Sequence, residues 1–352
     1  MSNAPSGSDL PRRRLGTTDL QITRVGFGSL AMGGAQWVSG RGEQSERDSL
    51  ASARAAVEAG VNWIDTAPVY GRGLAEELVG RVLRDFAEPD RPLIFTKAGL
   101  GWDDDDPRGE PVRTGDPARI RREVDDSLRR LGVERIDLFQ MHWPPLDAYT
   151  VDDYWPVFAE LRDAGKVRAI GLSNHSVEEL AAAERIAHVD SMQPPLSALT
   201  RDAAADVIPA SLANGTGVLA YAPMESGLLT GAFTEERART LSDTDWRRNS
   251  PEHTGEGLRR NLQVVDAIAA VAAERGVSTS AIAVAWALAV DGVTGAIVGA
   301  RVPEQTDDWI AAASLDLTRE ESSRIADAIE VFGAGTGPAR PARSRASDGV
   351  PA

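Results

Sequence analysis

The amino-acid sequence predicts an α/β protein folded as a (β/α)8 TIM barrel, with an N-terminal hairpin and a long loop after the seventh strand. The main observation is that eight short apolar runs alternate with amphipathic stretches of helical periodicity between about Val25 and Ile329. Such alternation is typical of parallel sheets, and eight units favour a closed barrel over an open doubly wound sheet. No linker rich in Pro, Gly and Ser interrupts this interval, so we expect a single domain over residues 12–333.

The apolar runs give the expected strands in chain order, and the stretches between them give the expected helices. We expect strands at 24–28, 61–65, 93–97, 136–142, 167–172, 191–194, 217–221 and 296–298. We expect helices at 44–59, 75–85, 117–131, 151–164, 177–185, 202–213 and 278–289.

Three kinds of segment fall outside the alternation. Residues 12–23 are expected to form a hairpin over the barrel floor, with its turn at residues 16–19. The stretch from Pro223 to about Leu258 is long and polar, which in a compact domain indicates a functional loop. Residues 1–11 and 334–352 are expected to be disordered tails, because the C-terminal stretch consists largely of Gly, Ala, Pro, Arg and Ser.

Composition limits the classes of function. The chain has 352 residues, a formal net charge of −15 and no cysteine. Binding to a nucleic-acid backbone requires clustered Lys or Arg, and thiolate chemistry requires cysteine. We therefore expect neither nucleic-acid binding nor thiolate chemistry. The start of the chain lacks the basic and apolar regions of a secretory signal, and no apolar stretch approaches a membrane span. We therefore expect a cytoplasmic protein with a small-molecule partner and no nucleic-acid or membrane partner.

Four polar side chains stand at the ends of consecutive expected strands. Asp65 and Tyr70 follow the second strand, Lys97 ends the third, and His142 ends the fourth. These strand ends meet at the catalytic face of a β/α barrel. Lys97 needs a counter-ion among its apolar neighbours, and Asp65 can supply it. The ammonium is expected to lower the pKa of the Tyr70 phenol below its usual value of about 10. The phenol could then protonate a carbonyl oxygen to which His142 also hydrogen-bonds.

Glycines near the first expected strand raise a competing interpretation, a nucleotide-binding Gly-rich loop. Gly26, Gly28 and Gly33 have the wrong spacing, because the Rossmann fingerprint needs glycine where the chain has Ala31. Tight packing and turning at a strand end explain these glycines better.

Six separate motifs resemble those of the aldo-keto reductase family, in order and from about Arg14 to Phe332. They lie at residues 60–71 (GVNWIDTAPVYG), 94–97 (IFTK), 137–144 (DLFQMHWP), 170–174 (IGLSN), 221–231 (YAPMESGLLTG) and 297–301 (IVGAR). The resemblance implies a (β/α)8 barrel and NADPH-dependent carbonyl reduction. It implies that Tyr70 is the proton donor, that Lys97 and Asp65 tune it, and that His142 orients the substrate.

The resemblance also implies a nicotinamide site at the ends of later strands. Ser173, Asn174 and Gln193 match positions that hold the nicotinamide carboxamide, and Tyr221 matches a position whose ring stacks on the nicotinamide. For Ser173 and Asn174 the alternative is an ordinary helix N-cap, a site that both residue types favour.

The rest of the expected NADPH/NADP+ site follows the seventh and eighth strands. Ser226-Gly227-Leu228 offers backbone N–H groups suited to a pyrophosphate. Arg301, which follows Gly299 at an expected helix start, can pair with the 2′-phosphate of NADPH. Gln305 lies one turn later, and Asp308 matches an acidic position near the adenine.

Several residues depart from the family pattern. Trp309 stands where an Asn near the adenine is usual, so it either stacks on the adenine or leaves the base held more weakly. Leu196 replaces a usual Tyr, and Ala232 replaces a usual Lys.

Substrate signals are few. Trp37, Trp102 and Trp143 follow the first, third and fourth expected strands and could line the mouth of the pocket. Aromatic rings there suit an apolar or aromatic carbonyl compound or the face of a sugar, although scattered structural tryptophans would give the same pattern.

The leading interpretation is an NADPH-dependent oxidoreductase that reduces an aldehyde, ketone or sugar carbonyl by hydride transfer. A barrel metallohydrolase built on His142 and Asp65 is a second possibility. It needs clustered ligands, and His175, His188 and His253 show no ligand spacing. A third possibility, a cofactor-binding regulatory subunit with little turnover, is disfavoured by the complete set of four strand-end residues.

Overall fold

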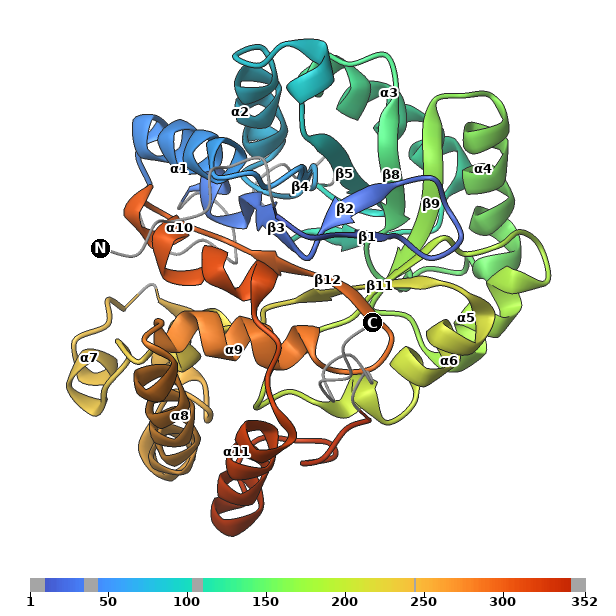
Figure 1. The fold of residues 1–352 in the computed structure, drawn as a ribbon. Coiled ribbons are helices and arrows are strands. Elements are labelled where there is room, and N and C mark those ends of the chain that lie inside the picture. Colours follow the sequence, from blue (N-terminus) through green and yellow to red (C-terminus); the bar gives the residue numbers. More distant parts are fainter. Residues whose placement is uncertain (1–9, 35–43, 103–109, 244, 343–352) are drawn as a thin grey trace, which may run out of the picture.

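The fold is a closed barrel of eight parallel strands, which confirms the predicted architecture (Figure 1). This computed structural model describes residues 10–34, 44–102, 110–243 and 245–342. Around the barrel the strand order is β10-β11-β12-β3-β4-β5-β8-β9. The strands are β3 (Val25–Gly28), β4 (Trp63–Asp65), β5 (Leu93–Ala98), β8 (Ile136–Met141), β9 (Val167–Ser173), β10 (Ser191–Gln193), β11 (Gly217–Tyr221) and β12 (Val293–Val298).

Helices surround the barrel at the positions that the periodicity predicts. They are α1 (Glu46–Glu58), α2 (Leu74–Leu83), α3 (Pro117–Leu131), α4 (Val151–Asp163), α5 (Val177–Glu184), α6 (Val207–Asn214) and α9 (Thr279–Leu288). Local sequence fixes their ends. The side chain of Asp116 caps α3, Pro117 occupies its first turn, and Gly132 ends it with a φ of 68°.

The segment after β11 contains more helix than the sequence analysis expected. Within the stretch expected to be a polar loop lie the 3-10 helices η4 (Glu225–Thr230) and η5 (Trp246–Asn249) and the short helix α7 (Glu235–Arg239). The long helix α8 (Gly255–Arg275) then begins inside that stretch. Helix α10 (Glu304–Trp309) corresponds to the helix expected after Arg301, whereas α11 (Arg319–Phe332) was not predicted.

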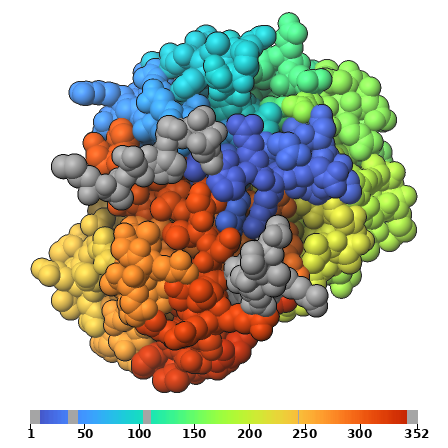
Figure 2. Space-filling model, in the orientation of Figure 1, coloured from blue at the N-terminus to red at the C-terminus, as the bar shows by residue number. Residues whose placement is uncertain are grey.

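The N-terminal hairpin covers the floor of the barrel, as predicted. Strands β1 (Arg12–Arg14) and β2 (Gln21–Thr23) pair antiparallel, and Figure 2 shows this segment in dark blue across one face of the molecule. Leu15 and Leu20 of the hairpin pack in one buried cluster with Trp63 and Phe95 of the barrel strands. Gly16 has a φ of 53°, and a Cβ there would lie 2.7 Å from the carbonyl oxygen of Gly215, so the turn requires glycine.

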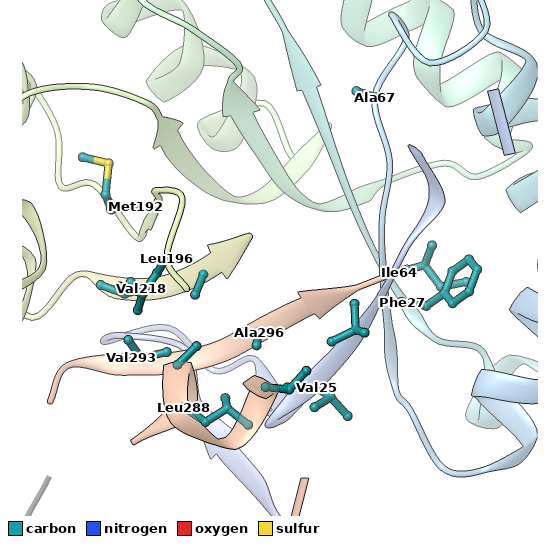
Figure 3. Packing of buried hydrophobic residues seen from close by; sticks show 14 of the residues in the cluster. Val25, Phe27, Ile64, Ala67, Met192, Leu196, Val218, Leu288, Val293 and Ala296 are labelled. Carbon is teal, nitrogen blue, oxygen red and sulfur yellow. The ribbon is translucent and has the colours of Figure 1, made fainter. Parts of the chain in front are cut away.

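The main core lies between the barrel and its helices. Figure 3 shows part of it, including Val25 and Phe27 of β3 and Leu288 of α9. The glycines of the first barrel strand belong to this packing, because a Cβ on Gly26 would lie 2.1 Å from the Trp63 ring. Close packing therefore accounts for Gly26, and the nucleotide-loop interpretation is not needed.

The C-terminal segment is ordered further than expected. Residues 334–342 lie against the barrel, because the buried guanidinium of Arg201 donates to the carbonyl oxygens of Ala334, Gly337 and Pro338 at 3.0–3.1 Å. The remaining residues of the expected tails, 1–9 and 343–352, lie outside the described residues.

No single helix in the described part of the chain is both long and apolar enough to cross a membrane. Helices α8 and α9 are long and apolar enough only when they are taken together, and a bend of 102° separates them.

Candidate active site

A cavity of about 650 Å³ opens at the carboxyl ends of the barrel strands. Most of the site residues expected from the sequence line it. These are Asp65, Tyr70, His142, Trp143, Ser173, Asn174, Gln193, Tyr221, Ser226, Gly227, Gly299, Arg301, Gln305 and Asp308.

A buried ion pair lies at the base of this cavity. The Lys97 ammonium lies 2.5 Å from Oδ1 of Asp65 and donates to the carbonyl oxygen of Thr66 at 2.9 Å. Register explains the contact, since Asp65 ends β4 and Lys97 lies near the end of the adjacent β5. Burial lowers the pKa of Lys97 while Asp65 raises it, and the amide of Gln193 donates to the other oxygen of Asp65 at 2.9 Å.

Tyr70 is buried among these charges, and its pKa moves opposite to the expected direction. The pKa of the phenol is raised well above 10, first by burial and then by the negative charge of Asp65. The Lys97 nitrogen lies 5.5 Å from the centre of the Tyr70 ring, but its charge is largely offset by Asp65. The prediction of a lowered phenol pKa is therefore wrong for this structure, and Tyr70 is protonated at neutral pH.

His142 lies beside Tyr70 as a neutral imidazole. Its pKa is well below 6.5 because of burial first, and then because of the positive charges of Lys97 and Arg113. The His142 and Tyr70 rings meet edge to face, with centroids 5.9 Å apart. Nδ1 of His142 is buried and has no hydrogen-bond partner among the described residues. A neutral imidazole can donate one hydrogen bond to a carbonyl oxygen without supplying a charge.

The expected nicotinamide residues form one connected group. The Tyr221 hydroxyl donates to Oδ1 of Asn174 at 2.8 Å, and the Asn174 amide donates to the carbonyl oxygen of His142 at 2.9 Å. Ser173 Oγ donates to the carbonyl oxygen of Gln193 at 2.9 Å. The alternative reading as a helix N-cap is not supported, because Ser176 caps α5.

The loop after β11 forms a strained wall of the cavity. Glu225, Ser226 and Gly227 have φ values of 47°, 54° and 94° in succession, a conformation that non-glycine residues rarely adopt. An N–H of Arg247 donates to the carbonyl oxygen of Ser226 at 3.0 Å. The side chain of Leu228 is fully buried in the core, so only its backbone could contribute to the expected diphosphate site.

Arg301 and Gln305 lie together at the edge of the cavity. The backbone N–H of Arg301 donates to Oε1 of Gln305 at 2.7 Å, and its Nε donates to Oε1 of Gln44 at 2.9 Å. Helix α10 begins at Glu304, three residues beyond Arg301 rather than at it. Trp309 ends α10, and although it is almost fully buried in the core it also lines the cavity.

The three tryptophans expected at the pocket mouth have different positions. Trp143 lines the cavity. Trp102 does not, because its ring packs against the guanidinium of Arg72 at 4.0 Å. Trp37 lies outside the described residues.

Two arginines line the cavity that the sequence analysis did not single out. Arg237 comes from α7 and Arg247 from η5. The expectation of a functional loop after the seventh strand pointed to this segment, but nothing local in the sequence indicates which of its arginines turns inward. No group of three or more potential metal ligands occurs among the described residues.

Proton-transfer groups at the strand ends of a parallel barrel, next to a cavity of this size, place the chain among barrel oxidoreductases. The model of the Aldo/keto reductase family matches residues 29–330. The chain therefore belongs to the aldo/keto reductase family.

Similar proteins that match most of the chain support this assignment. Aldo-keto reductase YhdN of Bacillus subtilis (strain 168) is 35% identical over 315 residues, covering 89% of this chain and 92% of that protein. The NADH-specific methylglyoxal reductase of Escherichia coli (strain K12) is 29% identical over 330 residues, covering 90% and 98%. The solved structure of the glycerol dehydrogenase AKR11B4 from Gluconobacter oxydans matches with a TM-score of 0.83 and 36% identity, covering 91% and 95%.

Proposed function

We propose that this protein reduces an aldehyde, ketone or sugar carbonyl with NADPH, and that Tyr70 donates the proton. The observation that carries the proposal is the protonated, buried phenol of Tyr70, which lines the cavity beside a neutral His142 and an Asp65–Lys97 ion pair. A nicotinamide cofactor supplies the hydride in reactions of this kind.

The residues of the cavity suit such a cofactor. Asn174 and Ser173 present amide and hydroxyl groups, Tyr221 presents a ring, and Ser226 and Gly227 of the loop after β11 lie in the same wall. These groups would hold the nicotinamide and the diphosphate, and Arg301 would hold the 2′-phosphate.

The proton transfer follows from the charges around Tyr70. His142 and the Tyr70 hydroxyl hydrogen-bond to the substrate oxygen, which polarises the carbonyl group. A bound nicotinamide cofactor would supply the hydride to the carbonyl carbon, and Tyr70 would give its phenolic proton to the carbonyl oxygen as that oxygen gains the π electrons. Lys97 stabilises the resulting phenolate until water restores its proton. Because its pKa is raised, the phenol carries its proton at neutral pH, which is the form that carbonyl reduction needs.

The preference for NADPH depends on Arg301. One relative is named as an NADH-specific reductase, so family membership alone does not determine the cofactor. A charge-assisted contact to a phosphate contributes about 1.5–3 kcal/mol, or roughly ten- to a hundredfold in affinity. Arg301 is a cation at the cavity edge, and its guanidinium donates to the side chain of Gln44 while its backbone N–H donates to Gln305.

The test is a titration of Arg301→Ala with NADPH and with NADH, followed by tryptophan fluorescence. We expect the ratio of the two dissociation constants to fall roughly ten- to a hundredfold. Arg121→Ala, an exposed arginine on α3, should leave the ratio unchanged. A wild-type protein that binds NADH as tightly as NADPH, or an Arg301→Ala variant that keeps its discrimination, would contradict this role of Arg301.

Catalysis is tested separately with a panel of carbonyl compounds and NADPH, measured by loss of NADPH absorbance. Turnover of several aldehydes supports the reductase. Tight cofactor binding without turnover of any compound in the panel would favour the alternative, a regulatory subunit.

A further inference from the structure

A short hairpin on the active-site face holds an arginine beside the cavity. Strands β6 (Leu100–Gly101) and β7 (Val112–Arg113) pair so that Arg113 lies opposite Leu100, which lines the cavity. The carbonyl oxygen of Arg113 also accepts from the backbone N–H of Leu146 at 3.3 Å. The backbone of Arg113 is therefore fixed between the segments that follow β5 and β8.

The guanidinium of Arg113 is stacked on an aromatic ring of the cavity wall. Its central carbon lies 4.2 Å from the centre of the Trp143 ring, and Trp143 directly follows His142 and lines the cavity. A guanidinium stacked by its face keeps its N–H groups in the plane, where they can bind a carboxylate or phosphate with two parallel hydrogen bonds.

The positive charge of Arg113 is not neutralised by a described side chain. Among the residues that the structure describes, no carboxylate forms an ion pair with Arg113. Lys97 differs, because Asp65 neutralises it. The charge of Arg113 reaches the carbonyl end of the cavity, since after burial and Lys97 it helps to lower the pKa of His142, and it partly offsets the rise in the pKa of Tyr221 that burial causes.

Barrel order separates Arg113 from the expected cofactor phosphates. The hairpin that carries Arg113 follows β5, whereas Arg301 follows β12 and the loop at residues 225–228 follows β11. In the closed order of eight strands, β5 lies opposite β11, and its neighbour β8 lies opposite β12. Arg113 is therefore across the barrel from the diphosphate and 2′-phosphate positions, on the side left for the substrate.

We propose that Arg113 binds an anionic group of the substrate, so that the preferred substrate is a carbonyl compound carrying a carboxylate or a phosphate. This inference rests on the proposed carbonyl reduction and narrows its substrate class. The net charge of the chain is −15, so an anionic substrate needs such a local cation to bind.

The test compares substrates that differ only in charge. One pair is 4-oxobutanoate and its methyl ester, and the other is glyceraldehyde 3-phosphate and glyceraldehyde. We expect wild type to prefer at least one anion over its neutral partner by roughly tenfold or more in kcat/KM. The pair with the larger preference distinguishes carboxylate from phosphate recognition. The preference should shrink as salt concentration rises, because salt screens the interaction.

Arg113→Met should lower kcat/KM for the anion roughly ten- to a hundredfold, mainly through KM, and leave the neutral partner nearly unchanged. Arg113→Lys should keep part of the preference. Arg72→Met is the matched control. Arg72 also packs on a tryptophan ring, that of Trp102, which does not line the cavity. The control variant therefore removes one positive charge without changing the cavity wall.

Three results separate this inference from the proposed function. Equal loss for both members of a pair in Arg113→Met means that Arg113 only supports Trp143, and it overturns the inference. Equal kcat/KM for the neutral and the anionic member of each pair in wild type also overturns the inference, but it leaves the proposed carbonyl reduction intact. Absence of turnover for every compound, charged or neutral, would instead remove the proposed function.

Discussion

Asp65 connects the buried charges of the active site. One carboxylate oxygen accepts from Lys97 and the other from Gln193. The same negative charge raises the pKa of Tyr70. The sequence was sufficient to predict the contact between Asp65 and Lys97, because both lie at the ends of adjacent strands. It was not sufficient to predict the direction of the Tyr70 pKa shift, which depends on how deeply the phenol is buried and how fully Asp65 offsets the ammonium.

Replacing Tyr70 with Phe should lower kcat for carbonyl reduction by about 10²–10⁴-fold, the usual contribution of general acid catalysis. The hydroxyl is the proposed proton donor, whereas the ring position is retained, so the dissociation constant for NADPH should change little. Stopped-flow reduction of an aldehyde and fluorescence titration of the cofactor measure the two quantities. Near wild-type kcat in Tyr70→Phe would show that another group donates the proton.

Replacing Lys97 with Met should shift the pH dependence of catalysis upward. Loss of the ammonium leaves Asp65 as an unbalanced negative charge beside Tyr70, and this raises the pKa of the phenol further. Alcohol oxidation needs the phenolate, so its rise with pH should move to higher pH. Reduction should lose kcat, because the phenolate that it forms is less stable.

The control for this experiment is Lys166→Met, which removes the other lysine of the chain, an exposed partner of Asp125. Its pH–rate profiles should match those of wild type. Identical profiles for Lys97→Met and wild type would mean that Lys97 does not tune Tyr70.

At the level of elements, the loop after β11 is held in its unusual conformation from two sides. Glu225 accepts hydrogen bonds from Ser197 and Thr200, at 2.5 and 3.1 Å. On the other side, Arg247 is paired with Asp245 and donates to the carbonyl oxygen of Ser226. Positive φ at a non-glycine residue costs about 1–3 kcal/mol, so these contacts offset strain that the isolated loop would release.

Replacing Arg247 with Met should therefore weaken cofactor binding roughly ten- to a hundredfold, which corresponds to the about 1.5–3 kcal/mol that a hydrogen bond to a charged group contributes. Because Arg247 is remote from Tyr70 in the barrel order, kcat at saturating cofactor should fall much less than in Tyr70→Phe. The adjacent Arg248 is exposed and pairs with Asp243, so Arg248→Met is the matched control. Unchanged cofactor affinity in Arg247→Met would show that the loop keeps its conformation without this contact.

The eight barrel strands could be predicted to within a few residues because each is a short apolar run between polar segments. Helix α8 was missed although its buried stripe, which includes Leu258, Val264 and Ile268, has helical spacing. The polar residues around that stripe made its beginning look like the end of a loop. The inward positions of Arg237 and Arg247, and the packing of Trp102 on Arg72, depend on contacts between distant segments that no local pattern encodes.

At the scale of the whole molecule, the C-terminal segment completes the outer layer of the barrel. The backbone N–H of Thr336 donates to Leu199 at 2.8 Å, and that of Asp291 donates to Ala342 at 2.9 Å. Gly335 has a φ of 64°, and a Cβ there would lie 2.0 Å from the carbonyl oxygen of Leu199. The prediction of disorder for residues 334–352 rested on the composition of the whole stretch. Composition does not show that the part up to Ala342 contacts the barrel.

Deleting residues 334–352 should destabilise the barrel, whereas deleting only 343–352 should not. The longer deletion removes three of the carbonyl acceptors of the buried Arg201 guanidinium. Leaving a buried charge without its partners costs about 3–5 kcal/mol. The shorter deletion keeps all three acceptors and removes residues whose composition is typical of disorder.

Urea unfolding followed by far-UV circular dichroism measures the difference between the two deletions. We expect a lower midpoint only for the longer one, with a free energy of unfolding reduced by about 3–5 kcal/mol. If the longer deletion fails to fold, Arg201→Met in the full-length chain provides a second measurement. That variant removes the charge together with its need for acceptors, so it should be less destabilised than the deletion. Equal midpoints for both deletions and wild type would mean that the contacts of Arg201 with residues 334–338 do not support the fold.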